Sequence, residues 1–150
     1  MTSKALVEEF LHESKIALVG ISRDKRKFGN TIYRELKKKG FALFPVNPNM
    51  TEFEEDKCYS SLSSLQQRVD ALIINIPPKN TKAIVEEAKN VGIKKIWMQQ
   101  GSESTEAIKF CNENNIEIIS GECILMFAEP AAFFHRAHRW INKIAGELPA

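Results

Sequence analysis

The sequence predicts an α/β fold, in which an open parallel sheet of five strands carries helices on both faces. Five short apolar runs, each suited to a strand buried on both sides, alternate with four stretches that have the period of an amphipathic helix. Strands and helices that alternate in this way form parallel pairs, because right-handed crossovers return the chain to the same end of the sheet. The expected arrangement is Rossmann-like and forms one domain over residues 1–150.

The first strand and the helix after it have the clearest signals. A short amphipathic helix is expected over Ser3–Leu11, and the apolar run Lys15–Ile21 then reads as a buried strand. Gly20 allows the backbone to come close to whatever lies beyond the strand. A long polar loop follows, after which Asn30 is expected to be the N-cap of a helix and Gly40 its C′ residue.

The other elements are bounded by turn residues. Strands are expected over Phe41–Val46, Asp70–Ile76, Lys95–Gln99 and Ile116–Ser120. Helices are expected over Leu62–Arg68, from about Asn80 to Gly92, through Glu103 and Glu106, and from near Pro130 to Gly146. The acidic segment Thr51–Lys57 reads as a surface loop. Pro77 and Pro78 take the chain out of the third strand, since neither can donate to a ladder.

Composition limits the kinds of protein to consider. With 43% hydrophobic and 27% charged residues, the chain is typical of a soluble globular domain, and no apolar run approaches the roughly 20 residues of a membrane span. A net charge of +2 gives no general argument for nucleic-acid binding. The three cysteines contain no CxxC pair, which favours neither a disulfide framework nor a zinc site. A cytoplasmic protein that binds neither nucleic acid nor membrane is expected.

Polar turns mark the expected site. In open parallel sheets, ligands bind beyond the carboxyl ends of the strands, at the switch point beside strand one. The turns that gather there are 22–30, 47–49, 77–80 and 99–102. The helix start near Asn30 provides free amides and the positive end of a dipole, which suits an anion. The loop cations Arg23, Lys25, Arg26 and Lys27 either contact a phosphate or are solvated.

The usual nucleotide fingerprints are missing. A dinucleotide site requires G-x-G-x-x-G after strand one and an acid at the end of strand two, whereas Gly29 is the next glycine after Gly20 and strand two ends in Val46-Asn47-Pro48. No Gly-Lys-Ser/Thr sequence occurs. The fold alone therefore indicates a nucleotide-like ligand and nothing finer.

Seven blocks of sequence, in order, resemble a known family. They are VGIS, GNTIYRELKKKG, PVNPN, CYSSL, VDALIINIPP, AIVEEAKNVGIKKIWMQQG and GEC. Together they cover about Lys15 to Cys123 and resemble the small stand-alone coenzyme A-binding domain proteins, which are similar to the nucleotide-binding domain of the succinyl-coenzyme A synthetase alpha subunit. The resemblance implies coenzyme A, or an acyl-coenzyme A, as the small-molecule nucleotide ligand.

The resemblance also implies where that ligand lies. In the family the pyrophosphate lies against the loop after strand one, which corresponds to Gly20, Ile21 and Ser22. The turns that shape the adenine and pantetheine path correspond to Asn47, Pro48, Ile76, Pro77, Pro78 and Gly101. Arg23, Lys27 and Asn30 complete the candidate set from their places in the loop and at the helix start.

The expected function is binding without catalysis, because the synthetase's phosphorylated histidine lies in a second domain. Two alternatives stay open. One is a small enzyme with acyl or thiol chemistry at Cys123, and the other is a nucleotide-sensing protein that docks on a partner through its last helix. A homo-oligomer through Phe133, Phe134 and Trp140 is also open. His135 and His138 have a spacing that could hold a metal, but His138 shares the apolar face of the helix, so packing is the stronger interpretation.

Overall fold

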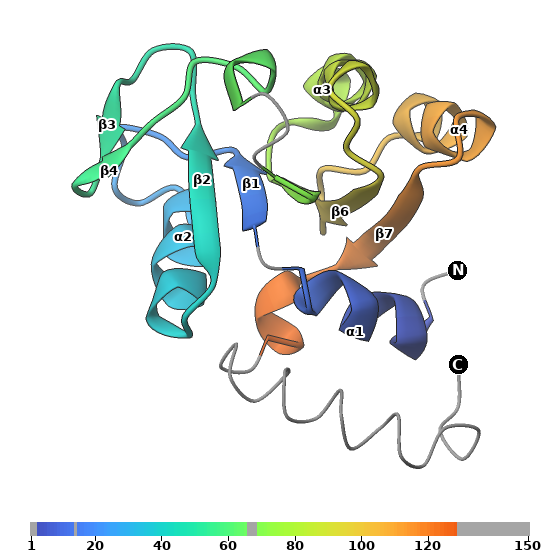
Figure 1. The fold of residues 1–150 in the computed structure, drawn as a ribbon, viewed down its shortest axis with the longest axis horizontal. Helices are drawn as coiled ribbons and strands as arrows, with labels where there is room; N and C mark the ends of the chain where they lie inside the picture. The colour runs from blue at the N-terminus through green and yellow to red at the C-terminus, as the bar shows by residue number, and fades with distance from the viewer. Residues whose placement is uncertain (1–2, 14, 66–68, 129–150) are drawn as a thin grey trace.

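The computed structural model describes residues 3–13, 15–65 and 69–128 and contains the predicted parallel sheet. Its strands are β1 (Lys15–Val19), β2 (Ala42–Val46), β5 (Ala71–Ile74), β6 (Lys95–Gln99) and β7 (Glu117–Glu122). They lie in the order β2-β1-β5-β6-β7, and all four pairs are parallel (Figure 1). The chain moves outward from β1 in both directions, so the switch point lies between β1 and β5.

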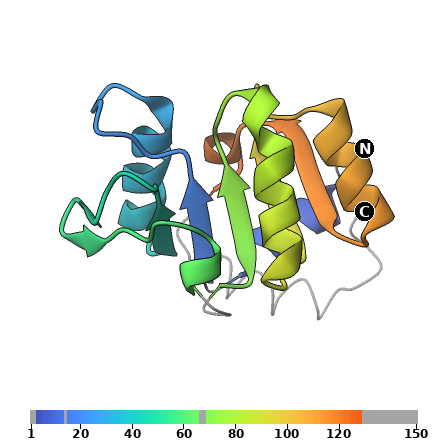
Figure 2. The same ribbon diagram turned by 90° about the horizontal axis from the view of Figure 1, so that it is seen from above.

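Helices cover both faces of the sheet, as the sequence predicts (Figure 2). One face packs on α1 (Lys4–Leu11) and α2 (Phe28–Lys38), and the other on α3 (Pro78–Asn90) and α4 (Thr105–Glu113). Strand β1 packs on both sides, since Ile16 and Leu18 belong to one core and Ala17 and Val19 to the other. This alternation explains why β1 reads as a continuous apolar run.

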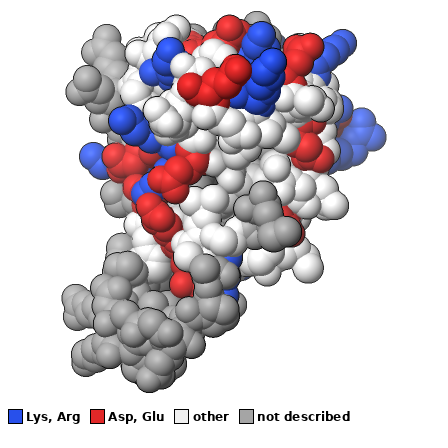
Figure 3. Space-filling model, turned by 90° about the vertical axis from the view of Figure 1, so that its right-hand side faces the viewer, with Lys and Arg blue, Asp and Glu red and all other residues white. Residues whose placement is uncertain are grey.

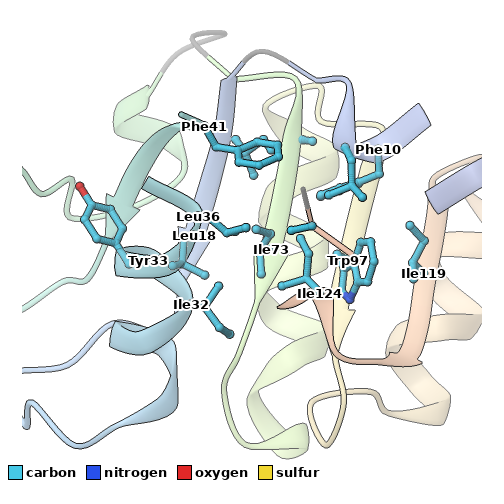
Figure 4. Packing of buried hydrophobic residues seen from close by; sticks show 14 of the residues in the cluster. Phe10, Leu18, Ile32, Tyr33, Leu36, Phe41, Ile73, Trp97, Ile119 and Ile124 are labelled. Carbon is cyan, nitrogen blue, oxygen red and sulfur yellow. The ribbon is translucent and has the colours of Figure 1, made fainter. Parts of the chain in front are cut away.

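The core on the α1 and α2 side contains the largest buried side chains (Figure 4). Trp97 is fully buried, its ring meets that of Phe10 edge-on at 5.4 Å between centroids, and its Nε1 donates to the carbonyl of Glu122 at 3.0 Å. The indole ring is thereby packed, and its N–H has a hydrogen-bond acceptor, as burial of a polar atom requires.

The start of α2 corrects one expectation. Asn30 is not the N-cap, because the helix already begins at Phe28 and Lys27 occupies the cap without a side-chain hydrogen bond. Asn30 instead lies in the first turn, fully buried, and its amide points back to the preceding loop. The C′ position of Gly40 agrees with prediction: the glycine follows the C-cap Lys39 with a φ of +93°.

The acidic segment after β2 is a hairpin rather than a plain loop. It pairs β3 (Glu52–Phe53) with β4 (Asp56–Lys57) in antiparallel sense. Its turn residues Glu54 and Glu55 have φ values of +47° and +73°, a conformation usually taken by Gly or Asn. The sequence offers no such turn signal, which explains why the hairpin is missed.

Several boundaries also differ from the sequence-based ones. The third predicted strand leaves the ladder at Ile74, and α3 starts at Pro78, where a missing N–H costs no hydrogen bond. The helix expected over Leu62–Arg68 is a 3₁₀ turn at Ser63–Leu65 in the part that is described, and a second such turn, η2, spans Ile124–Met126. The last predicted helix, with His135 and His138, lies outside the described residues. No helix in the described ranges has the length and apolar character needed to span a bilayer.

Candidate functional site

The candidate site lies at the carboxyl edge of the sheet, where the loops after β1, β2, β5 and β6 lie. The loop after β1 begins at Gly20, whose backbone is in direct contact with that of the β5 exit. Gly20 has a φ of +136°, and a Cβ built on it would lie 2.3 Å from the carbonyl oxygen of Asn75. A Cβ on Gly29 would lie 2.0 Å from the carbonyl oxygen of Gly20. The close backbone approach predicted for Gly20 is therefore a contact with Asn75 and Gly29 of the same chain.

Asn30 holds the polar loop against α2. Its Oδ1 accepts from the amide of Ser22 at 2.8 Å, and its Nδ2 donates to the carbonyls of Ser22 at 2.7 Å and Asp24 at 3.1 Å. The amides of Asp24, Arg26 and Lys27 also donate to groups within the loop. Most of the backbone donors of the loop are thus already engaged within the protein.

Asn47 joins this loop to the turn after β2. Its Nδ2 donates to the carbonyl of Ile21 at 2.9 Å, while its Oδ1 accepts from the amide of Asn49 at 2.7 Å. Arg23 reinforces the contact, because its guanidinium donates to the carbonyl of Asn49. The structure therefore brings Ile21, Arg23 and Asn47 together, while Pro48 stays exposed beside them.

The remaining loop cations face solvent. Arg26 pairs with Asp24 at 3.2 Å, with the arginine side chain 91% exposed, and Lys25 and Lys27 are exposed as well. Hydrogen bonds from the backbone and side chain of Arg26 hold the pKa of Asp24 below its ordinary value. The loop thus offers several exposed positive charges at the edge of the sheet, and Asp24 is their counterion within the loop. Phe28, which no sequence pattern singles out, follows them in the chain and is 46% exposed.

The turns after β5 and β6 are tied to each other by a buried serine. Ser102 Oγ accepts from the amide of Ile76 at 3.0 Å, and the Ser102 carbonyl accepts from Thr81 Oγ1 at 2.6 Å. The sequence places Ser102 in a polar turn but gives no sign of this linking role, which depends on β5 and β6 being neighbours. Pro77, Pro78 and Gly101 are exposed around this anchor, and Ile76 is half-buried.

Two helix starts at this edge have no side-chain cap. Neither Lys27 before α2 nor Pro77 before α3 provides one, whereas Ser104 Oγ accepts from Ala107 N at the start of α4. Uncapped first-turn amides, together with the helix dipole, favour an anion. The switch point is thus flanked by two anion-favouring helix starts.

A hollow of about 520 Å³ opens beside the turn after β2. It is lined by Pro48, Asn49, Met50, Thr51, Lys57, Cys58, Tyr59, Ser60 and Ser64. The size lies within the usual range of small-ligand sites. Of this lining, only Pro48 is among the residues predicted from the sequence, because Lys57, Cys58 and Tyr59 are brought beside it by the unpredicted hairpin and by the pairing of Tyr59 with the end of β2.

Cys123, just beyond β7, is half-buried, and its Sγ lies 2.9 Å from the Nε2 of Gln99. A carboxamide donates to the sulfur but cannot take its proton, so this neighbour does not activate the thiol. Burial raises the pKa of the Cys58 thiol, and it raises that of Cys111 to about 11.

Fold and edge together define a doubly wound α/β domain whose polar loops meet at the switch point. The chain belongs to the CoA binding domain family, whose model matches residues 14–129.

Relatives of the chain include both small and large proteins. It is 28% identical over 123 residues to the uncharacterized protein YneT of Bacillus subtilis, covering 81% of this chain and 91% of that one. It is 34% identical over 90 residues to the ADP-forming acetate–CoA ligase II of Archaeoglobus fulgidus, which covers 59% of this chain but 13% of the ligase. The solved structure of a conserved hypothetical protein from Pyrococcus furiosus matches with a TM-score of 0.73 and 42% identity, over 76% of this chain and 98% of that one.

Proposed function

We propose that the chain binds coenzyme A, or an acyl-coenzyme A, across the carboxyl edge of the sheet and catalyses nothing by itself. The observation that carries this proposal is the family match over residues 14–129, a range that contains all the loops of the candidate site. The position of those loops at the switch point supports it independently, because that is where open α/β sheets bind ligands.

The electrostatics of the edge suit this ligand. Coenzyme A carries a pyrophosphate and a separate phosphate on its ribose, and the uncapped starts of α2 and α3 lie beside the exposed cations of the loop. Because the amide of Ser22 is already bonded to Asn30, we assign the pyrophosphate to the first turn of α2 and to the side chains of Arg23 and Lys27. Gly20, Ile21 and Ser22 then form the floor that holds these groups in place.

The rest of the ligand would pass over the neighbouring turns. Ile76, Pro77 and Pro78 offer half-buried and exposed apolar surface after β5, and Gly101 lies on the adjoining turn. Asn47 and Pro48 border the other side. A binding role without catalysis is supported by Cys123, whose neighbour Gln99 cannot act as a base.

Location and partners belong to the same proposal. Cys58, Cys111 and Cys123 are free thiols, which suits the reducing cytoplasm. In the Archaeoglobus ligase the matching segment accounts for 13% of the chain, so the unit there is accompanied by other parts. We accordingly propose that this module works beside a protein partner or a second copy of itself.

Thermal unfolding with three ligands tests the proposal. At 100 times its dissociation constant, a ligand stabilises the native state by about 2.7 kcal/mol, which raises the Tm by roughly 5–10 °C for a chain of this size. Coenzyme A should produce such a shift, whereas NAD should not, because Asn47 stands where an acid would hold the ribose hydroxyls. Equal shifts with coenzyme A and NAD, or none with coenzyme A, would overturn the assignment. Native mass spectrometry of protein purified from cells checks the bound mass directly.

A further inference from the structure

The hollow beside β2 has walls that are fixed by the backbone. On one side, Tyr59 donates its amide to the carbonyl of Pro45 at 2.9 Å, and Asn47 donates its amide to that of Tyr59 at 2.9 Å. On the other, Cys58 donates its amide to the carbonyl of Thr51 at 2.9 Å. The hollow is therefore preformed and does not depend on a ligand to shape it.

The lining combines one charge with neutral groups. Lys57 is the one charged side chain among the nine described residues around the hollow. Its Nζ lies 4.9 Å from the centroid of the Tyr59 ring, and the exposed hydroxyls of Thr51 and Ser60 lie on the same lining. Pro48 and Met50 add apolar surface. A cation with hydroxyls and apolar walls suits a phosphorylated sugar attached to a flat base.

The hairpin sets the direction of Lys57. Side chains alternate along a strand, so Phe53 and Asp56 share one face of the hairpin and Glu52 and Lys57 share the other. The first face is fastened to α2: the Phe53 ring packs edge-on against that of Tyr33 at 4.9 Å, and Asp56 accepts from Tyr33 and Lys37. With that face fixed, Lys57 is turned toward the hollow.

The hollow adjoins the loop after β1. Arg23 donates to the carbonyl of Asn49, which is part of the lining, and Asn47 next to it donates to Ile21. A ligand with its pyrophosphate at the start of α2 can therefore place its ribose in the hollow without leaving the protein surface.

We propose that Lys57 is a specificity-determining residue that pairs with the ribose phosphate of the bound nucleotide in this hollow. The inference rests on the proposed function and adds to it the residue that distinguishes coenzyme A from dephospho-coenzyme A. The carboxylate of Glu52, which is paired across the hairpin from Lys57, weakens the attraction between Lys57 and the ribose phosphate.

Calorimetry at low salt with Lys57→Met tests the assignment, since methionine keeps an unbranched side chain over Tyr59 and removes the charge. Coenzyme A and adenosine 3′,5′-bisphosphate should bind about fivefold more weakly to this variant, with no change for dephospho-coenzyme A. Lys94→Met is the matched control, because Lys94 is also exposed but lies at the amino edge of the sheet, and this variant should bind all three ligands like the wild type. Glu52→Gln should act in the opposite direction and strengthen the two ligands that carry the ribose phosphate.

The outcomes separate the two proposals. If the wild type binds coenzyme A and Lys57→Met keeps the same preference over dephospho-coenzyme A, the role of Lys57 is wrong and the proposed function stands. If Arg26→Ala with Lys27→Ala alone abolishes the preference, the ribose phosphate lies at the loop. If the wild type binds neither coenzyme A nor the bisphosphate, both proposals fail. Thermal unfolding of each variant confirms that it is folded.

Discussion

Single side chains order the irregular part of this protein. Asn30 is fully buried and makes three hydrogen bonds to the backbone of the loop that precedes its own helix. Asn47 similarly bridges the loop after β1 and the turn after β2. A carboxamide can do this because it both donates and accepts, so a single residue matches backbone groups of either kind.

Asn30→Ala should destabilise the protein by about 2–4 kcal/mol, because it leaves buried backbone groups without partners. Asn30→Asp should cost at least as much at pH 7, since a buried carboxylate would face the two carbonyls that now accept from the amide. Urea unfolding measures both losses, and trypsin should cut the basic loop faster in either variant. Asn112→Ala, on the exposed side of α4, is the control and should change stability by less than about 0.5 kcal/mol. Unchanged trypsin sensitivity would show that Asn30 does not order the loop.

Gly29→Ala should be more costly than Gly92→Ala, although the second position has the less usual backbone. A Cβ at Gly29 meets the backbone oxygen of Gly20, and neither β1 nor α2 can move away freely, so we expect a loss of about 3 kcal/mol or more. At Gly92 a Cβ meets nothing within 4 Å, and only its φ of +87° opposes alanine, at about 1–2 kcal/mol. Chemical denaturation ranks the two, and the reverse order would contradict the contact between Gly20 and Gly29.

At the scale of elements, the β3–β4 hairpin depends on α2. Arg34 pairs with Glu54 at 2.6 Å, and Asp56 accepts from Tyr33 and Lys37. These contacts hold a turn whose two central residues, Glu54 and Glu55, both have positive φ and like charge. The helix thus stabilises a hairpin that would be strained on its own.

Stability should fall in acid through Asp56. Burial alone would raise the pKa of this carboxyl, but hydrogen bonds from Lys37 and Tyr33 outweigh burial and place the pKa below its ordinary value. A lowered folded pKa means that the contribution is complete above the unfolded pKa of about 3.9 and is lost as pH falls through the folded value. The difference in unfolding free energy between the wild type and Asp56→Asn, about 1 kcal/mol near pH 6, should therefore shrink below about pH 4. A difference independent of pH would show that Asp56 does not titrate in this contact.

Sequence patterns predicted the elements more completely than their contacts. The five strands and the alternating helices follow from apolar runs and periods that are local in the chain. Ser102 linking the turns after β5 and β6, and the hairpin lying against Tyr33, depend on neighbours distant in sequence. Asn30 was predicted at the right end of the right helix, but its side chain serves the loop because α2 begins two residues earlier.

At the scale of the whole molecule, the balance of positive and negative charge differs from one part of the surface to another. The face over α4 and β7 shows Lys and Arg side chains interspersed with Asp and Glu (Figure 3). The loop after β1, by contrast, carries Arg23, Lys25, Arg26 and Lys27 around the single acid Asp24. This loop therefore concentrates positive charge at the carboxyl edge of the sheet, where it attracts an anionic ligand.

This distribution predicts a salt-dependent affinity. Arg26→Ala combined with Lys27→Ala should weaken coenzyme A binding several-fold at low salt, and the loss should diminish near physiological ionic strength, where the Debye length is about 8 Å. Calorimetry at two salt concentrations measures the effect. Lys109→Ala on α4 serves as an exposed control away from the edge. A loss that is the same at both salt concentrations would contradict the expectation that these two side chains meet the ligand while exposed to solvent.

The unequal burial of the three thiols makes the native protein suitable for site-selective labelling. Cys58 and Cys111 are almost completely enclosed, and burial keeps both in the protonated form that reacts poorly with alkylating reagents. Cys123 is the more accessible thiol and lies next to Gln99 at the carboxyl edge. A fluorophore or spin label added to the unaltered chain should therefore react first at Cys123, where its signal reports on the candidate site without any engineered cysteine.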